Sequence, residues 1–576
     1  VSLELAPLIA QKDTERAIHF YEQSRKFFGT WDYPSRLFTT LLGEATVLTS
    51  EKQHKKALEL IRQALLIAEE LDIALQQQET TPRSFVYIQQ AIEIAILVAA
   101  QKLGEQKDAG TIENILDWST RSKVAKLLPF LPNNLGFEKC SELPALAQKE
   151  SGLIQQISKL QKELEKLPRT QITQQEFATR CQVIRSKMKN LLNEIDVNRN
   201  VILAACPDPG RALPPRDYKT LQKIIALIPP KRRWILISYD MFRRQNRIIV
   251  TIDDHINRHA VYTIPISPDL ISLITKLHSI GKSDELPPAI QLQDMGTNLY
   301  RGLIPSQLQK EISDRTYDYI QVITDDFLHH VPFELFFDGH QYWGLKYPMS
   351  WAPNLQLLES TMKAQALAQQ ETPSVIFGGN TGPEEQPRRK NKAKEILNSF
   401  LAAVPTKTEG SEPVVLFGQD FSRQKFSEAC RHPRSLIYLS TATKAHHSKG
   451  EITLLYPDSL RTIELGVTTV FEGAPIVVLD EMTQIAPLEN GLSLAAFIKR
   501  LVTAGASSLV FTRWLPNTQI QHHFTSILTH RLYERDPIAV ALLHARRELA
   551  NQQTSPNSWL PYTLVGNPFS SLFSEL

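Results

Sequence analysis

The chain has four cysteines, and a cysteine thiolate is well suited to attack a carbonyl carbon. Cys140, Cys181, Cys206 and Cys430 are far apart in the 576-residue sequence, so their spacing matches neither a disulfide framework nor a zinc site. A thiol nucleophile also needs a nearby imidazole, because an unassisted thiol is mostly protonated at neutral pH. No cysteine follows Cys430, which leaves the C-terminal part of the chain without a thiol nucleophile.

Histidines are the second group of candidates for acid–base or metal chemistry. The pairs that begin at residues 329, 446 and 522 lack the i, i+4 spacing and the carboxylate of a zinc protease. His446 and His447 could serve as a displaced general base, but neighbouring histidines in a loop are more often solvated polar residues. We therefore expect no metal and no cofactor.

An acidic pair and a glycine-rich segment are further candidates. Asp480 and Glu481 follow a strand-like run, where they could bind a basic peptide or a cation; a solvated loop edge is the alternative. The segment GGNTGPEE lacks the Gly-Lys-Ser/Thr sequence that a phosphate-binding loop requires. Gly378 and Gly379 are therefore predicted to form a turn.

Strands alternating with helices in the C-terminal half would position these residues. Apolar runs of strand length are predicted at 233–242, 247–253, 317–326, 373–380, 435–443, 475–482 and 508–514, and helices at 269–279, 491–506 and 536–553. This pattern predicts a largely parallel sheet that is buried on both faces. Ligands of such sheets bind at the carboxyl ends of the strands, so the loops after Thr443, Met482 and Trp514 are the expected place for chemistry.

The first 128 residues are predicted to form tetratricopeptide-like helical repeats. Ala57, Ile61 and Ala64 recur at offsets of four and three, and small residues at these positions let a second helix approach closely. Leu42 and Gly43 occupy the place of the repeat's Leu-Gly pair. The alternative is an ordinary helical bundle, because alanine and leucine at helical spacing are mostly core residues.

Residues 129–205 are predicted to form a helical hairpin. Apolar residues have heptad-like spacing on both sides of Pro168, first at 157, 160, 164 and 167 and then at 177, 181, 184, 188, 191 and 195. Two such stripes joined by a short polar turn favour antiparallel helices. Cys181 lies in the second stripe, which indicates a buried apolar role rather than a reactive thiol.

Composition and charge exclude several classes of partner. The chain has 64 lysines plus arginines and 61 aspartates plus glutamates, for a formal net charge of +3. This balance gives no electrostatic footprint for nucleic acid or an anionic membrane, and no apolar run approaches the ~18 residues of a transmembrane helix. The basic runs PKRRW and PRRKNKAKE are predicted to be solvated loops, with an RNA contact as the alternative.

The first residues, VSLELAPLIA, lack the basic segment and apolar core of a signal peptide. They also lack an initiator methionine, so they could be the cut end of a longer chain. Together with the unpaired cysteines, this favours a cytoplasmic protein.

The order of these segments resembles the CHAT family, in which tetratricopeptide repeats precede a caspase-related protease domain. Residues 115–128 are similar to the family's helix that closes the repeats. The motif I-P-D-x-x-L-H-x-L-P-F-E-x-L is matched by Asp326, Leu328, His329, Pro332, Phe333, Glu334 and Leu335. Further segments that resemble the family lie at 349–358, 495–516 and 557–568.

The sequence departs from the family at the two motifs that carry its chemistry. An active member has a histidine base in H-x-A-T-H-G and a cysteine nucleophile in L-S-A-C-E-T. Here the first strand reads YLSTATK, with Ala442 at the base position, and the second reads VVLDEMTQ, with Met482 at the nucleophile position. Alanine accepts no proton and a thioether has none to lose. Cys430 is predicted to lie on a helix before the first motif, as a core thiol.

The resemblance implies an α plus α/β protein, with the repeats at 1–128, the hairpin at 129–205, and a caspase-like region with a largely parallel sheet in two halves, 206–370 and 371–576. It implies a catalytically inactive pseudoprotease that binds a protein or peptide through its repeats or its vacant groove, as a scaffold or regulator in bacterial signalling or defence. The candidate groove residues are Thr441, Thr443, Asp480, Glu481 and Trp514. Two alternatives stay open: a cysteine peptidase or other hydrolase with a displaced catalytic arrangement, and a helical-repeat interaction module supported by the α/β part.

Overall fold

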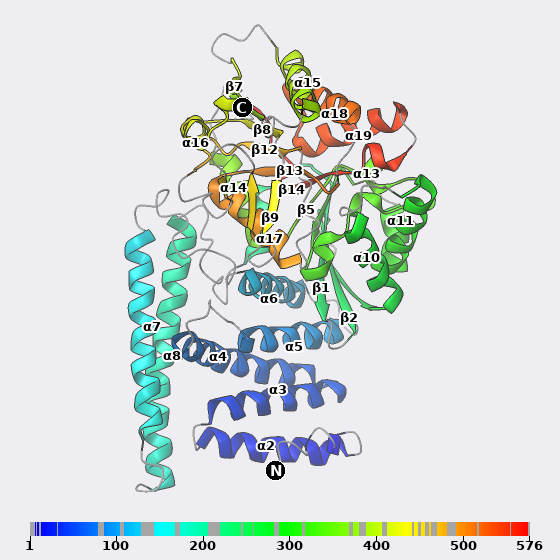
Figure 1. The fold of residues 1–576 in the computed structure, drawn as a ribbon. Coiled ribbons are helices and arrows are strands. Elements are labelled where there is room, and N and C mark those ends of the chain that lie inside the picture. The colour runs from blue at the N-terminus through cyan, green and yellow to red at the C-terminus, as the bar shows by residue number, and fades with distance from the viewer. Residues whose placement is uncertain are drawn as a thin grey trace. The chain divides into compact units, whose positions relative to one another are not determined.

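The chain divides into two compact units (Figure 1). The helical unit contains helices α2–α8, and the α/β unit contains the strands and the later helices, mainly residues 220–258 and 263–576. The computed structural model describes residues 6, 9–10, 13–30, 33–78, 86–103, 109–127, 143–167, 173–205, 219–242, 246–256, 259–280, 287–313, 317–367, 373–379, 387–405, 412–440, 443–446, 451–454, 460–461, 469–480, 491–514, 518–552 and 555–573.

The first part of the helical unit is a series of helices, each packed against the next along the chain. Their bounds are α2 (Thr14–Thr30), α3 (Pro34–Ser50), α4 (His54–Gln78), α5 (Val86–Leu103) and α6 (Ala109–Leu127). Short connections between packed neighbours are typical of antiparallel helices. The prediction of an N-terminal helical region is confirmed.

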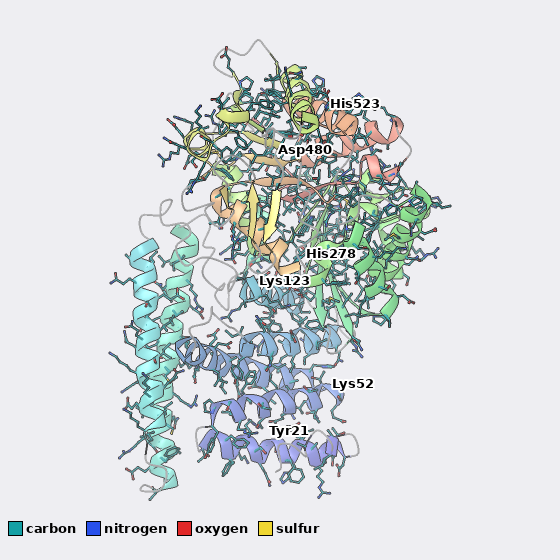
Figure 2. The ribbon with its side chains drawn as sticks, in the orientation of Figure 1. Tyr21, Lys52, Lys123, His278, Asp480 and His523 are labelled. Carbon is teal, nitrogen blue, oxygen red and sulfur yellow. The ribbon has the colours of Figure 1, made fainter. Side chains whose placement is uncertain are left out.

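Small residues permit the close approach of these helices. Ala57, Ile61 and Ala64 on α4 are completely buried. A Cβ atom added to Gly43 on α3 would lie 2.6 Å from the ring of Tyr21 on α2, a distance that real Cβ contacts essentially never show. Glycine at position 43 therefore lets α2 and α3 pack through the tyrosine ring, which Figure 2 labels.

The hairpin consists of α7 (Leu143–Glu165) and α8 (Gln174–Ala205), which pack against each other. Its core follows most of the predicted stripes, with the following buried residues: Leu153, Ile157, Leu164, Phe177, Cys181, Ile184, Met188, Leu192 and Ile195. The predicted residues Leu160, Leu167 and Leu191 are only partly buried, and Leu192 takes the buried position expected of Leu191. Cys181 is 2% exposed. Burial of these apolar side chains is the main driving force for pairing, and the predicted hairpin is confirmed.

Asp72 connects α4 to the start of α5. Its two carboxylate oxygens accept hydrogen bonds from the backbone N–H groups of Tyr87, at 3.1 Å, and Ile88, at 2.8 Å. These groups belong to the first turn of α5, where no intrahelical acceptor is available. Burial raises the pKa of Asp72 to about 7, although the two backbone hydrogen bonds oppose the shift.

We predict that the stability of this helical junction depends on pH. A raised pKa means that the folded state binds the proton more tightly than the unfolded chain. Between about pH 4 and pH 7, Asp72 keeps a proton in the folded state that the unfolded chain has released, so stability falls as pH rises and levels off above about pH 7. Hydrogen-exchange protection of the Tyr87 and Ile88 amides should decrease over this range in the parent chain.

The Asp72→Asn variant removes the titrating group and should remove this pH dependence. Two other acids on α4 serve as controls, because Glu69 pairs with Arg121, and Glu70 pairs with Arg185 at 2.8 Å. Glu70→Gln should leave the slope between pH 4 and pH 7 in place. An equal slope in the parent and in Asp72→Asn would assign the dependence to another group.

The α/β unit is built on one sheet of eleven strands (Figure 1), in the order β3-β2-β1-β4-β5-β14-β13-β12-β8-β6-β7. The strands are β1 (Trp234–Phe242), β2 (Arg247–Asp254), β3 (His259–Pro265), β4 (Tyr319–Ile323), β5 (Met349–Ala352), β6 (Val375–Gly379), β7 (Val414–Phe417), β8 (Leu436–Ser440), β12 (Ile476–Leu479), β13 (Ser508–Thr512) and β14 (Tyr562–Gly566). A separate three-stranded sheet contains β9 (Thr443–His446), β10 (Glu451–Leu454) and β11 (Leu460–Arg461).

Two parallel blocks make up most of the large sheet, and β2 pairs antiparallel with β1 beside them. Strands β1, β4, β5 and β14 run parallel to one another, as do β13, β12, β8, β6 and β7, and the blocks meet where β13 and β14 pair antiparallel. The carboxyl ends of the two blocks therefore lie at opposite edges. The prediction of a largely parallel sheet is confirmed. The finer division at residue 370 stays a prediction, although a single sheet runs through both parts.

Helices and short 3₁₀ turns cover this sheet. They are α9 (Thr220–Leu227), α10 (Pro268–Ile280), α11 (Ala289–Leu303), α12 (Ser306–Ser313), η3 (Asp326–His330), η4 (Phe333–Leu335), α13 (Trp343–Lys346), α14 (Leu355–Leu367), α15 (Pro387–Ala403), η5 (Gly418–Asp420), α16 (Arg423–Cys430), α17 (Gly491–Ala504), α18 (Thr518–Tyr533), α19 (Ile538–Gln552) and η7 (Pro556–Ser558). Among them, α15 packs against α18, and α18 against α19.

Two local predictions are wrong. The basic run PRRKNKAKE was expected to be a loop, but α15 begins at Pro387, whose fixed φ suits the first turn of a helix. Gly378 and Gly379 do not form a turn, because they end strand β6. A Cβ atom on Gly378 would lie 2.7 Å from the side chain of Leu439 and 2.8 Å from that of Phe421, so close packing, rather than a turn, explains the glycine.

Candidate functional site

The carboxyl ends of β8, β12 and β13 meet at one edge of the sheet. These strands are parallel neighbours, with Leu439 of β8 paired with Leu479 of β12, and Leu479 with Phe511 of β13. All three are buried along their length, which agrees with their continuous apolar sequences. The positions expected to carry chemistry follow these strand ends.

Asp480, which Figure 2 labels, directly follows β12, and two tyrosines hold its side chain at this edge. Its side chain is completely buried. Oδ2 accepts a hydrogen bond of 2.8 Å from the Tyr438 hydroxyl, and Oδ1 accepts one of 3.3 Å from the Tyr562 hydroxyl. The backbone N–H of Asp480 donates to Leu439 O at 3.0 Å, and its carbonyl accepts from Gln521 Nε2 at 3.1 Å. Asp480 therefore joins β12 to β8, β14 and α18.

Tyr438 extends this network toward α15 and α18. Its hydroxyl lies 2.6 Å from Thr525 Oγ1 on α18. Its ring is stacked on Phe377, with ring centroids 5.7 Å apart, and packs against Phe400 of α15 at 5.6 Å. Aromatic packing of this kind fixes the ring, so the hydroxyl is directed at the carboxylate of Asp480. The carboxylate consequently points into the interior.

The structure brings together only part of the predicted site. Thr441, Ala442, Glu481 and Met482 lie outside the described residues, as does His447. The dyad positions and the other half of the acidic pair therefore stay predictions.

Three predicted residues besides Asp480 are placed by the structure. Thr443 and His446 are the first and last residues of β9, where they pair with Leu454 and Glu451 of β10. Trp514 follows β13 and is 5% exposed. Trp514 and Asp480 thus contribute to the packed end of the sheet, and whether they bind a partner stays a prediction.

A second polar cluster surrounds Glu334, a residue of the quoted family motif. Glu334 is 2% exposed, and its Oε1 accepts hydrogen bonds from Thr563 Oγ1, at 2.7 Å, and from Arg546 Nη2, at 3.2 Å. Arg546 Nη2 also donates to the carbonyl of Tyr562 at 2.8 Å. This buried ion pair connects η4, α19 and β14.

Arg513 adds a second buried cation beside this pair. Its Nη1 donates to His329 O at 3.2 Å, and its guanidinium lies 5.6 Å from the ring centroid of Trp351. Burial lowers the pKa of Arg513 to about 10, and the nearby carboxylate of Glu334 opposes this shift. Burial also lowers the pKa of Arg546, again opposed by Glu334. The negative charge of Glu334 therefore opposes the effect of desolvation on both guanidinium groups.

The two cysteines within the described residues are buried thiols. Cys430, the last residue of α16, has no exposed surface, and burial raises its pKa well above the ordinary value. A thiol with a raised pKa is a poor source of thiolate. Among the described residues, no group of three or more His, Cys, Asp or Glu side chains could hold a metal ion.

The hydrogen-bond partners of Asp480 could not be predicted from the sequence. Tyr438, Gln521 and Tyr562 are 42, 41 and 82 positions away from it along the chain. A partial signal exists for Tyr438. It lies two residues before the end of β8 and pairs with Val478, which lies two residues before Asp480. Adjacent parallel strands place such residues side by side, but the neighbour relation of the strands has to be known first.

Comparisons with known proteins identify the α/β region. Residues 293–567 match the family model of the CHAT domain. No curated protein matches the chain. Among solved structures, a chain of the Saccharomyces cerevisiae separase–securin complex is 10% identical, with a TM-score of 0.39 over 93% of this chain and 50% of that one. A chain of the complex of Porphyromonas gingivalis RgpB pro- and mature domains is also 10% identical, with a TM-score of 0.32 over 53% of this chain and 76% of that one.

This chain spans about half the length of the separase–securin chains that it matches. At these TM-scores the structural likeness adds no argument of its own, so the assignment depends on the family match. None of the described helices combines the length and apolar character needed to cross a bilayer. Residues 293–567 form a CHAT domain.

Proposed function

We propose that this protein is a catalytically inactive CHAT-domain protein that binds a protein or peptide partner. The observation that carries the proposal is the state of its thiols. The position of the family's nucleophile is Met482, and no cysteine follows Cys430. Cys430 itself is completely buried with a raised pKa. A cysteine peptidase needs an accessible thiolate next to a base, which neither Met482 nor Cys430 supplies.

The state of Asp480 argues against the alternative of a displaced hydrolase. A carboxylate nucleophile or general base needs an oxygen within reach of the substrate. Both oxygens of Asp480 accept hydrogen bonds from tyrosine hydroxyls inside the protein, and the residue has no exposed surface. The proposal accordingly assigns the former catalytic edge to binding, in a scaffold or regulator of bacterial signalling or defence.

Loss of activity is tested with a cysteine-directed vinyl or acyl probe and mass spectrometry. The native parent chain should give no adduct on Cys430, whereas the unfolded chain should react. The matched pair Met482→Cys and Ala442→His/Met482→Cys restores the thiol without and with the family's base. Labelling at position 482 should be much faster in the double variant, because the imidazole generates the thiolate. Rapid labelling of Cys430 in the native parent would contradict inactivity.

Partner binding is tested by affinity capture with the full chain and a Met482→Arg variant. A specific protein that the parent retains and the variant loses would locate binding at the edge where β12 ends. A partner retained by both would assign binding to the helical repeats instead. Accumulation of cleaved fragments of the partner with the parent chain would show that the protein is a peptidase.

A further inference from the structure

Helix α8 carries a second heptad stripe in addition to the one that packs on α7. Its members recur at spacings of four and three, and all are exposed: Val183, Lys187, Asn190, Glu194, Val197 and Val201. The three valines are 51%, 61% and 43% exposed. They are the exposed large apolar side chains of the hairpin, among its described residues. The buried stripe through Ile184 and Met188 occupies a different face of the helix.

Within the described part of the chain, no contact explains valine at these positions. It is a poorer helix former than lysine, glutamine or glutamate, because its branched Cβ restricts side-chain rotation in a helix. An exposed valine side chain also contributes little hydrophobic free energy to folding, because it stays in contact with water. Single exposed apolar residues are ordinary on protein surfaces, but three at heptad spacing on one helix face form a pattern that indicates a covered surface.

The order of side chains along this stripe is self-complementary. Val183 and Val197 lie seven residues before and after Asn190, about 10.5 Å away along the axis on either side. Lys187 lies three residues before Asn190 and Glu194 four residues after it. Reversal of the stripe about Asn190 therefore places valine on valine, and lysine within about 1.5 Å of the level of glutamate.

We propose that two copies of the chain pair through this stripe, with their α8 helices antiparallel about a two-fold axis at Asn190. Val183 then contacts the partner subunit's Val197, and Lys187 faces the partner subunit's Glu194. Both contacts occur twice, as a two-fold interface requires. Asn190 meets the same residue of the partner subunit on the axis, where two amides can donate to and accept from each other.

Charge decides the direction of pairing and the kind of partner. A parallel, in-register pair would place Lys187 on the partner subunit's Lys187 and Glu194 on the partner subunit's Glu194, and like charges at an interface are unfavourable. In the antiparallel arrangement each lysine faces a glutamate of the partner subunit, so both repulsions are replaced by attractions. The contact is limited to one face of two helices, which is at the small end of specific interfaces. We therefore expect a weak dimer that forms in a concentration-dependent manner and does not depend on the proposed inactivity of the CHAT domain.

Sedimentation equilibrium of the full chain tests the proposal through a charge exchange. Lys187→Glu and Glu194→Lys should each weaken the dimer by about tenfold or more, since each places like charges opposite each other. The double variant Lys187→Glu/Glu194→Lys should restore the dimer. An equimolar mixture of the two single variants should associate more strongly than either alone. The control Lys189→Glu makes the same change at an exposed position of α8 outside the stripe and should have little effect.

Disulfide formation tests the direction of pairing. A mixture of Val183→Cys and Val197→Cys chains should form an intermolecular disulfide under mild oxidation, faster than either variant alone and faster than the parent with its own four cysteines. Faster formation with Val183→Cys alone would indicate a parallel pair and contradict the proposal. A parent chain that stays monomeric over the whole concentration range, with variants that behave identically, would also overturn it.

Discussion

Replacing Glu334 by alanine is expected to lower the free energy of unfolding of the α/β unit by about 3–5 kcal/mol, the range for breaking a buried ion pair by removing one partner. Glu334 and Arg546 are 2% and 0% exposed. Without the carboxylate, the guanidinium groups of Arg546 and Arg513 lose the negative charge that opposes their desolvation. Thr563 also loses its acceptor at 2.7 Å.

Three further variants separate the charge from the hydrogen bonds. Thr563→Val removes only the hydroxyl and should cost about 1 kcal/mol. Arg546→Met leaves Glu334 with its threonine donor and should be strongly destabilising. The double variant Glu334→Ala/Arg546→Met should be milder than the sum of the two single variants, because it leaves neither member of the pair as an unpaired charge. Glu334→Gln serves as the substitute if the alanine variant does not fold.

Urea unfolding of the full chain, followed by tryptophan fluorescence, measures these changes. The signal reports mainly on the α/β unit, which contains the following tryptophans: Trp234, Trp343, Trp351, Trp514 and Trp559. A loss below about 1 kcal/mol for Glu334→Ala would show that water or rearrangement compensates the charge. Additive single effects in the double variant would show that Glu334 and Arg546 do not interact.

The parts of the fold that depend on local periodicity could be predicted from the sequence. The heptad stripes of the hairpin and the positions 57, 61 and 64 of α4 indicate which side chains are buried, and the structure confirms most of them. The continuous apolar runs similarly predict buried strands of a mainly parallel sheet. In these segments, neighbours in space are near neighbours in the sequence, so the pattern contains the information.

The order of the strands could not be predicted in the same way. β14, near the end of the chain, lies between β5 and β13 and reverses the direction of the sheet there. The sequence predicts a turn at Gly378 because the close neighbours that require a glycine, Leu439 and Phe421, are 61 and 43 positions away. Long-range pairings of this kind decide the environment of a residue without leaving a local signal.

The candidate site shows the same limit. From the sequence, Asp480 could be either a ligand for a basic group or a solvated loop residue. The structure gives it a third role, because the hydroxyls of Tyr438 and Tyr562 reach it from two other strands. By contrast, the absence of a histidine at position 442 and of a cysteine at position 482 follows from residue identity alone and requires no knowledge of the fold.

Replacing Asp480 by alanine is expected to destabilise the α/β unit by about 2–4 kcal/mol, since it removes the shared acceptor of two buried hydroxyl donors. The hydroxyls of Tyr562 and Tyr438 both lose their carboxylate acceptor, and the Tyr438 hydroxyl keeps its contact with Thr525. Asp480→Asn retains a carbonyl acceptor of the same shape and should cost less. Tyr562→Phe removes one donor and should also cost less than Asp480→Ala. Both comparisons use the same urea unfolding curves.

The opposing effect is the desolvation of the Asp480 carboxylate, which alanine would relieve. Asp480 accepts two hydroxyl hydrogen bonds, at 2.8 and 3.3 Å, and backbone hydrogen bonds hold the residue in place. We expect these hydrogen bonds to outweigh the desolvation cost, so that aspartate is more stabilising than alanine at this position. Unchanged or increased stability in Asp480→Ala would show that desolvation outweighs these bonds. Because Met482 follows two residues later, a partner that binds at this edge should be lost with Asp480→Ala but retained with Thr563→Val, which changes β14 without touching the end of β12.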